Sequence, residues 1–210
     1  MKTSLLVAAA LALLAMPVAQ AAGFYGDGQA VSNFVWRGIS QSNNNPALQG
    51  GGGYDGPYGL YASVWGSTMD RNDAWVRADL RGGMKERLSS GFSWNFGVVA
   101  HRFNESALNF NELYLRLGIG GISGRVSRDW QQGDTYLSVR DRLHLGSGFR
   151  LILHAGHTSG AEVPHYTDVA AGLTKRIQSW NLGLWTSDTD LSSSVPGAGA
   201  HLWLSIGTLW

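Results

Sequence analysis

Residues 111–119 read Asn111-Glu112-Leu113-Tyr114-Leu115-Arg116-Leu117-Gly118-Ile119, and this stretch decides the fold. Apolar residues occupy every second position from Leu113 onward, and more polar or small residues lie between them. Because successive side chains of a β-strand point to opposite faces, the pattern predicts a strand with one oily face and one polar face. The segments that begin at Phe92 and at Leu202 show the same alternation.

Outward from this stretch, period-2 alternation recurs along the chain and is interrupted by clusters of Gly, Asn, Asp and Ser. We therefore expect twelve strands, with ten as the alternative count. Their predicted ranges are 28–37, 46–54, 58–67, 73–82, 90–101, 110–119, 122–130, 134–144, 149–157, 166–175, 179–187 and 199–210.

A β-sandwich would show the same alternation, and three features favour a membrane barrel instead. Many predicted strands have about nine to twelve residues, which is long enough for a tilted strand to cross a bilayer and longer than usual for a soluble sheet. Trp and Tyr lie near many strand ends, as in the interfacial girdles of membrane barrels. The last strand ends in an aromatic residue, Trp210, and resembles the C-terminal signal read by the barrel-assembly machinery. The predicted fold class is all-β, an antiparallel up-and-down transmembrane β-barrel of about 12 strands in contact with outer-membrane lipids.

The start of the chain predicts export. Lys2 precedes an apolar run from Leu5 to Leu14, and Ala19-Gln20-Ala21 is a small-x-small cleavage site. This layout is typical of a secretory signal peptide over residues 1–21, which leaves a barrel over residues 22–210. We therefore expect the bacterial outer membrane of a Gram-negative organism as the location.

Composition excludes other classes of protein. The chain has no cysteine, which excludes a disulfide scaffold and thiolate metal sites. A formal net charge of +1 gives no footprint for nucleic acid. Neither catalytic residues nor a cofactor motif are predicted.

An even strand count places both termini on the periplasmic side, where the turns should be tight. The expected turns are Asp55-Gly56-Pro57, 83–89, Gly120-Gly121, 145–148 and 176–178; the expected outer loops are 38–45, 68–72, 102–109, 131–133, 158–165 and 188–198. None of these loops is long enough for us to expect it to fold into the lumen as a constriction or plug.

Charged residues on the less oily faces are the candidate pore lining, because Arg at mid-depth facing lipid costs roughly 2–4 kcal/mol. Arginine exceeds carboxylate among them, which favours anionic or neutral polar solutes. A network that only braces the wall is the alternative, and Arg77 and Arg81 share a face with Trp75, which leaves their direction open. The candidates are Arg77, Asp79, Arg81, Glu112, Arg116, Arg125, Asp129, Arg140, Arg142 and Arg150.

A second candidate site is a mouth-loop motif at the top of the first predicted strand. It comprises Arg37, Gln41, Asn43 and Asn44, and Asn followed by Pro46 favours a turn. Arg37 either donates hydrogen bonds to the carbonyl groups of the loop and so fixes its fold, or binds a solute at the mouth. The glycine run 50–53 lacks a phosphate-loop lysine and a following helix, so it predicts sharp wall curvature or a bulky close neighbour.

Histidines do not predict a metal site. His154 and His157 are three apart, which on a strand puts them on opposite faces. Lipid-active barrel enzymes need a Ser–His–Asn/Glu arrangement near the lipid-facing surface. Ser138 and His144 are present, but no local motif orders them.

Residues 34–50, Phe-Val-Trp-Arg-Gly-Ile-Ser-Gln-Ser-Asn-Asn-Asn-Pro-Ala-Leu-Gln-Gly, resemble the opening signature of the TorF family of proteobacterial porins, also called Gcw_chp. Residues 59–67, 111–115, 166–175 and 186–190 are similar to later parts of that family, in the same order. The resemblance implies an outer-membrane barrel whose solute is undefined. This chain is somewhat short and ends in Trp210 where phenylalanine is more usual.

The leading functional hypothesis is passive diffusion of small hydrophilic solutes, neutral or anionic, through a barrel whose oligomeric state the sequence leaves open. The rivals are a closed structural or adhesive barrel that binds a partner through its loops, and a lipid-active enzyme.

Overall fold

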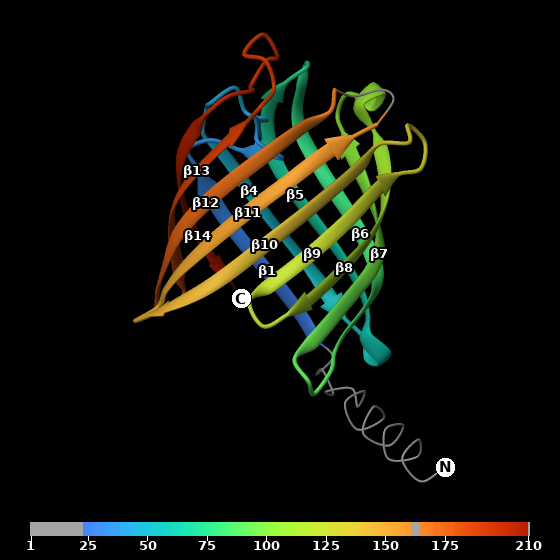
Figure 1. Cartoon of the computed structure of the whole chain (residues 1–210), viewed down its shortest axis with the longest axis vertical. Coiled ribbons are helices and arrows are strands. Elements are labelled where there is room, and N and C mark those ends of the chain that lie inside the picture. The colour runs from blue at the N-terminus through green and yellow to red at the C-terminus, as the bar shows by residue number, and fades with distance from the viewer. Residues whose placement is uncertain (1–22, 161–163, 210) are drawn as a thin grey trace, which may run out of the picture.

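The computed structural model describes residues 23–160 and 164–209, which form a closed barrel of twelve antiparallel strands (Figure 1). Neighbours in sequence are neighbours in the barrel, and β14 closes it by pairing with β1. The predicted all-β up-and-down transmembrane barrel of about 12 strands is therefore confirmed. The expected signal peptide over 1–21 and the terminal Trp210 lie outside the described residues.

Twelve strands build the barrel wall, and two short strands, β2 and β3, pair only with each other. Their bounds are β1 Gly23–Val31, β2 Val35–Trp36, β3 Ile39–Ser40, β4 Ala47–Asp55, β5 Leu60–Arg71, β6 Ala74–Arg87, β7 Phe92–Phe103, β8 Phe110–Ile119, β9 Ile122–Asp129, β10 Thr135–Gly146, β11 Phe149–Ser159, β12 Tyr166–Ile177, β13 Trp180–Thr189 and β14 His201–Leu209. Two short 3-10 turns, Pro57–Gly59 and Ser106–Leu108, lie between strands. In this part of the chain no helix is long and apolar enough to cross a membrane.

The alternation along β8 decides which face is outside. Leu113, Leu115 and Leu117 are 41, 38 and 44% exposed, whereas Glu112 and Tyr114, which alternate with them, are buried. Leu202, Leu204 and Ile206 on β14 are likewise exposed. An oily outer belt with polar residues inside is the pattern of a membrane barrel, and it excludes the two-layer sandwich.

The first strand was predicted wrongly. The sequence pattern placed it at 28–37, but β1 ends at Val31 and the chain then turns into the barrel. Phe34-Val35-Trp36 looks like a continuation of the strand because its residues favour β-structure. Phe34 instead joins Val31, Ala47, Met69 and Ala74 in a buried cluster, against which Trp36 also packs.

The segment 32–46 therefore enters the lumen, and the expectation that no loop would do so is wrong. Within it, β2 and β3 form a hairpin whose two turn residues, Arg37 and Gly38, have φ of 50° and 75°. Positive φ at both central residues is the geometry of a tight two-residue hairpin turn. We call residues 32–46 the inner loop and residues 35–40 its hairpin.

Several predicted connections also shift. Strand β6 continues to Arg87, so the expected turn 83–89 contracts to residues 88–91. The expected loop 68–72 is the two-residue turn Asn72–Asp73, with φ of 51° and 63°. Trp75 is 66% exposed, so it points outward although it lies two positions from the inward Arg77. The pairing of β6 with β5 has a register shift between Thr68 and Arg71, which marks an irregularity at this level.

The glycine run 50–53 lies on β4 beside β1. A Cβ added to Gly53 would lie 2.5 Å from the Tyr25 hydroxyl, and one added to Gly51 would lie 3.0 Å from the Cα of Trp65. These close neighbours leave no room for a side chain at Gly51 or Gly53, as expected for a bulky close neighbour.

Candidate functional site: a lumen divided by an inner loop

The inner loop is held by a dense set of hydrogen bonds. The Asn33 amide oxygen accepts hydrogen bonds from the hydroxyls of Ser40 and Ser42, and its amide nitrogen donates to Asn44. Ser40 N donates to Gly197 O at 2.8 Å, which ties the loop to the β13–β14 connection. Because these polar groups satisfy one another, the loop has a defined shape inside the barrel.

The tip of the hairpin reaches the far wall. A Cβ added to Gly38 would lie 2.8 Å from the Cβ of Asp168 on β12 and 3.1 Å from that of Thr189 on β13. Arg37 Nη2 donates to Glu112 Oε1 on β8 at 2.5 Å, and its guanidinium lies 4.1 Å from the ring centroid of Tyr136 on β10. The hairpin therefore spans the lumen and is anchored on several strands.

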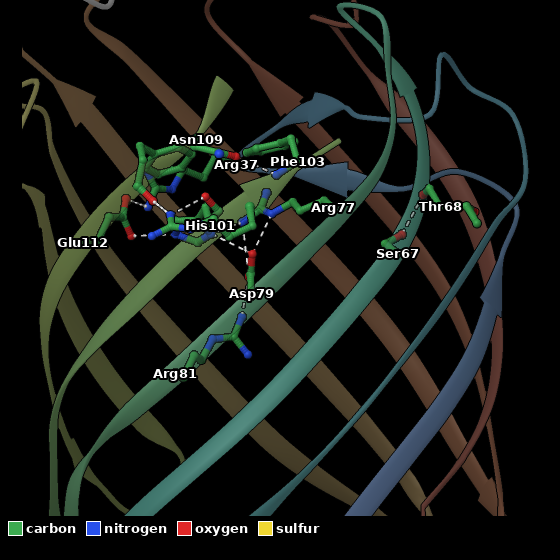
Figure 2. Close-up of polar contacts among 12 residues, drawn as sticks. Arg37, Ser67, Thr68, Arg77, Asp79, Arg81, His101, Phe103, Asn109 and Glu112 are labelled. Atoms are coloured by element: carbon green, nitrogen blue, oxygen red, sulfur yellow. Dashed lines mark hydrogen bonds and ion pairs between the residues drawn. The ribbon is translucent and has the colours of Figure 1, made fainter. Parts of the chain in front are cut away.

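A buried network lies beside this anchor (Figure 2). Asp79 accepts hydrogen bonds from Arg77 Nε at 2.8 Å and from Arg81 Nη2 at 2.7 Å. His101 Nδ1 lies 2.7 Å from Asp79 Oδ1, and its Nε2 lies 3.5 Å from Glu112 Oε2. Figure 2 shows these side chains converging on Asp79 and Glu112 from the β6, β7 and β8 strands and the hairpin.

A second network lies on the wall under the hairpin tip. The Tyr136 hydroxyl lies 2.8 Å from His154 Nε2 and donates to Asp168 Oδ2 at 3.1 Å. Gly156, on the strand between them, leaves the space that the Tyr136 ring occupies. Asp168 is thereby paired, although it lines the lumen.

The hairpin divides the lumen into two cavities. The inner chamber, about 430 Å³, is lined by wall residues that include Arg81, Arg116, Arg125, Arg140, Trp185 and Trp203. The outer chamber, about 320 Å³, lies among the longer loops and is lined by residues that include Leu108, Phe110, Asp129, Thr158, Tyr166 and Leu191. Trp36, Arg37 and Glu112 line both, so these three residues form the partition.

Charge in the inner chamber is unequal. Its lining contains six arginines and three carboxylates among the described residues, namely Arg37, Arg77, Arg81, Arg116, Arg125 and Arg140 against Asp79, Glu112 and Asp168. Each carboxylate is engaged by a cation or hydroxyl as described above. The side chains of Arg116 and Arg140 make no hydrogen bond or ion pair within residues 23–160 and 164–209.

Arg116 and Arg140 lie on either side of a third arginine, Arg125, on three neighbouring strands. Arg116 on β8 lies directly opposite Arg125 on β9, and Arg125 lies opposite Ser138, two residues before Arg140 on β10. Arg125 is partly engaged, since its Nε donates to Ser127 Oγ at 2.8 Å and its Nη2 lies 3.7 Å from Glu112. We call Arg116, Arg125 and Arg140 the arginine wall.

The other predicted residues have separate places. Arg142 and Arg150 continue the alternation of β10 and β11 toward the turn at 147–148, beyond the inner chamber. Asp129 borders the outer chamber, where its Oδ1 accepts from Gln131 N at 2.8 Å. Arg77 is 1% exposed, and its Nε and Nη2 donate to the two carboxylate oxygens of Asp79, so it braces the hairpin region.

The mouth-loop motif does not stand on top of a strand, as the sequence pattern suggested. Arg37 lies at the hairpin tip within the lumen, and the Gln41 amide donates to Ile39 O. Asn43 and Asn44 have φ of 52° and 60°, in the left-handed region that asparagine tolerates. Of the four residues, Arg37 alone reaches across to the far wall.

Sequence reasoning missed His101, Tyr136, His154 and Asp168. All four lie on inward positions of their strands, and the same alternation that selected the arginines marks them. Metal-ligand spacing does not single out the two histidines, and Tyr136 and Asp168 are recognised only when all inward polar positions are considered together. The described residues contain no cluster of three or more side chains suited to a metal ion.

A sequence model of a bacterial family of unknown function, Gcw_chp, matches residues 18–200. This chain belongs to the Gcw_chp family. The resemblance noted at residues 34–50 is thus confirmed, and those residues of this Gcw_chp protein are the ones that build the inner loop and enter β4. No curated protein sequence matches the chain significantly.

Two solved structures that are similar to this Gcw_chp chain are of a porin. The KdgM porin is 9% identical with a TM-score of 0.65, and the match covers 89% of this chain and 98% of that one. The KdgM porin in complex with disordered oligogalacturonate is 8% identical with a TM-score of 0.63, and the match covers 90% and 98%. At these identities the likeness establishes the fold alone: the chain has the closed β-barrel fold of these porins.

Proposed function

We propose that this protein is a passive channel for small hydrophilic solutes and that it favours anions over cations. The observation that carries the proposal is the arginine wall, because two of its three guanidinium groups face the inner chamber without a carboxylate partner. Positive side chains without partners that line a pore attract anions and repel cations. Neutral polar solutes would pass more slowly.

The cost of the arginine wall supports a functional role. Like charges directly opposite each other on neighbouring strands destabilise a sheet, and Arg116 lies opposite Arg125. A wall that only needed bracing would alternate charges, as Arg77, Asp79 and Arg81 do on β6. Bracing and selectivity therefore belong to different residues.

The path that we infer passes through both chambers. A solute enters the outer chamber between the longer loops, passes the hairpin at Trp36 and Arg37, and reaches the arginine wall. Arg142 and Arg150 extend the positive surface toward the periplasmic turns. The hairpin limits the size of the solute, and no chemical step or cofactor is part of the proposal.

A closed structural barrel is the second candidate, and the hairpin that spans the lumen is the observation that favours it. For either candidate we also expect that the leader is cleaved and that the assembly machinery reads the C-terminal strand, while the oligomeric state stays open. None of these points decides between a channel and a closed barrel, so conduction must be measured.

The direct experiment is reconstitution in planar bilayers under a salt gradient. We expect discrete conductance steps and a reversal potential that reports preference for chloride over potassium. The double substitution Arg116→Ala with Arg140→Ala should shift the reversal potential toward zero or to cation preference. Arg128→Ala, on an exposed position of β9, is the matched control and should change neither. Folded protein that never conducts would refute the channel and favour the closed barrel.

A further inference from the structure

Trp185 lies against the barrel wall over two glycines. Cβ atoms added to Gly172 on β12 or to Gly183 on β13 would collide with its indole, and the indole nitrogen donates to Ser205 Oγ on β14 at 3.0 Å. Contacts with three neighbouring strands require the ring to lie flat along the wall. Any side chain at either glycine would push the ring off this surface.

Trp203 lies next to Trp185 on the inner wall. It is the direct cross-strand partner of Trp185, and the two rings are nearly parallel, at 10°, with centroids 6.1 Å apart. Both line the inner chamber and both are only partly buried. We call Trp185 and Trp203 the tryptophan platform.

The tryptophan platform faces the arginine wall. In the closed ring of strands, β14 and β8 are half a turn apart, so Trp203 and Arg116 project into the inner chamber from opposite sides. One side offers flat aromatic surface and the other offers guanidinium groups without partners. A cavity with apolar surface and a few convergent polar groups is the usual form of a small-molecule site.

We propose that the inner chamber is a binding subsite for a ring-bearing carboxylate, an inference that rests on the proposed anion channel and names its solute class. The carboxylate pairs with Arg116 or Arg140, because a guanidinium group can donate two parallel hydrogen bonds to a carboxylate. The ring packs on the tryptophan platform, as aromatic faces favour flat partners. The chamber, about 430 Å³, is within the range of small-molecule pockets, which runs from roughly 300 to 1,000 Å³.

This arrangement distinguishes ring acids from inorganic anions and from open-chain acids. Chloride or phosphate would use the arginine wall alone, and the tryptophan platform would add nothing. An open-chain acid loses rotational freedom when it is flattened on the platform, whereas a rigid ring does not. Two kinds of ring acid share this chemistry, aromatic acids and sugar acids in the ring form.

The experiment is calorimetric titration of the detergent-folded mature chain with benzoate, hexanoate, glucuronate and gluconate. Benzoate and hexanoate compare a ring with an open chain among apolar acids; glucuronate and gluconate do so among hydroxylated acids. We expect at least one ring acid to bind ten-fold or more tightly than its open-chain match. Whichever pair shows the preference identifies the solute as aromatic or sugar-like.

The substitution Trp185→Leu keeps apolar bulk and removes the flat ring. It should weaken binding of the preferred ring acid by ten-fold or more and leave the affinity for its open-chain match unchanged. Trp180→Leu, on an exposed position of the same strand, is the matched control and should change neither. Trp185→Phe retains a smaller ring and should give an intermediate loss, which keeps the test valid if Trp185→Leu fails to fold.

Equal affinities for ring and open-chain acids, or no binding of any acid, would overturn the subsite. An equal loss for all acids in Trp185→Leu would overturn it too, because that is the effect of general damage. The titration does not depend on conduction. A barrel that binds ring acids but shows no anion-selective current would refute the proposed channel and leave the subsite standing.

Discussion

Arg37 and Glu112 are 75 positions apart in the sequence, and in the barrel Arg37 Nη2 donates to Glu112 Oε1 at 2.5 Å. This contact joins the tip of the hairpin to strand β8 and closes the partition between the two chambers. Both side chains are largely withdrawn from solvent, so the pair is stronger than a surface salt bridge. This ion pair is therefore one of the contacts that set the width of the lumen at this level, together with the packing of the hairpin tip on β12.

Arg37→Ala should raise single-channel conductance two-fold or more. The substitution removes the contact with Glu112 and the packing of the guanidinium on Tyr136, so the hairpin tip loses its attachment to β8 and β10. Arg128→Ala, on an exposed position of β9, is the control and should conduct like the parent protein. Unchanged conductance in Arg37→Ala would mean that the hairpin does not limit the current.

Asp79→Asn should lower the free energy of unfolding by about 3 kcal/mol, the cost of removing one partner from a buried charge pair. Arg77, 1% exposed, would keep its charge in a buried site without a carboxylate, and Arg81 would lose its partner as well. Urea unfolding of the barrel in lipid vesicles, followed by tryptophan fluorescence, measures the change. Asp73→Asn, in an exposed turn, should stay within about 0.5 kcal/mol of the parent. A similar small change for Asp79→Asn would show that the network does not stabilise the barrel.

Substitutions at two adjacent residues of β11 test which face of the barrel wall meets lipid and which meets the lumen. Leu153 is 42% exposed on the outer belt, whereas Ile152 lines the inner chamber. Leu153→Arg should cost roughly 2–4 kcal/mol of stability in lipid. Ile152→Arg should cost less and should increase anion preference in the bilayer measurement. Equal destabilisation by both would contradict the assignment of faces.

The regular part of the fold could be predicted because lipid requires apolar side chains on the outward face of every strand. The predicted range of the Phe110–Ile119 strand agrees with the structure, and the outward leucines there are the ones that the alternation selected. The first strand could not be placed, because Phe34-Val35-Trp36 has the composition of a strand while Gly23–Val31 contains three glycines. Burial of Phe34 within the lumen depends on residues as distant as Met69 and Ala74, which local pattern does not reveal.

The candidate site was predictable only in part for the same reason. Alternation along a strand places Arg116 and Arg140 on inward faces, but it does not show that they lack partners. That follows from which strands are neighbours and at what register, for example the pairing of Arg116 with Arg125. The role of Arg37 depends on the turn at Gly38 and on contact with the far wall, and these are tertiary features.

Gly38→Ala tests that contact against a matched control. Gly38 has φ of 75°, and a Cβ there would lie 2.8 Å from Asp168 Cβ; Gly91 has φ of 82°, and a Cβ there would meet nothing within 4 Å. Both alanine variants should lose about 1–2 kcal/mol of unfolding free energy, because each places a side chain in the left-handed region. Only Gly38→Ala must also move the hairpin tip from the wall, so it alone should change conductance, with larger or noisier current steps in the planar bilayer. Identical currents in the two variants would show that the tip does not rest on β12.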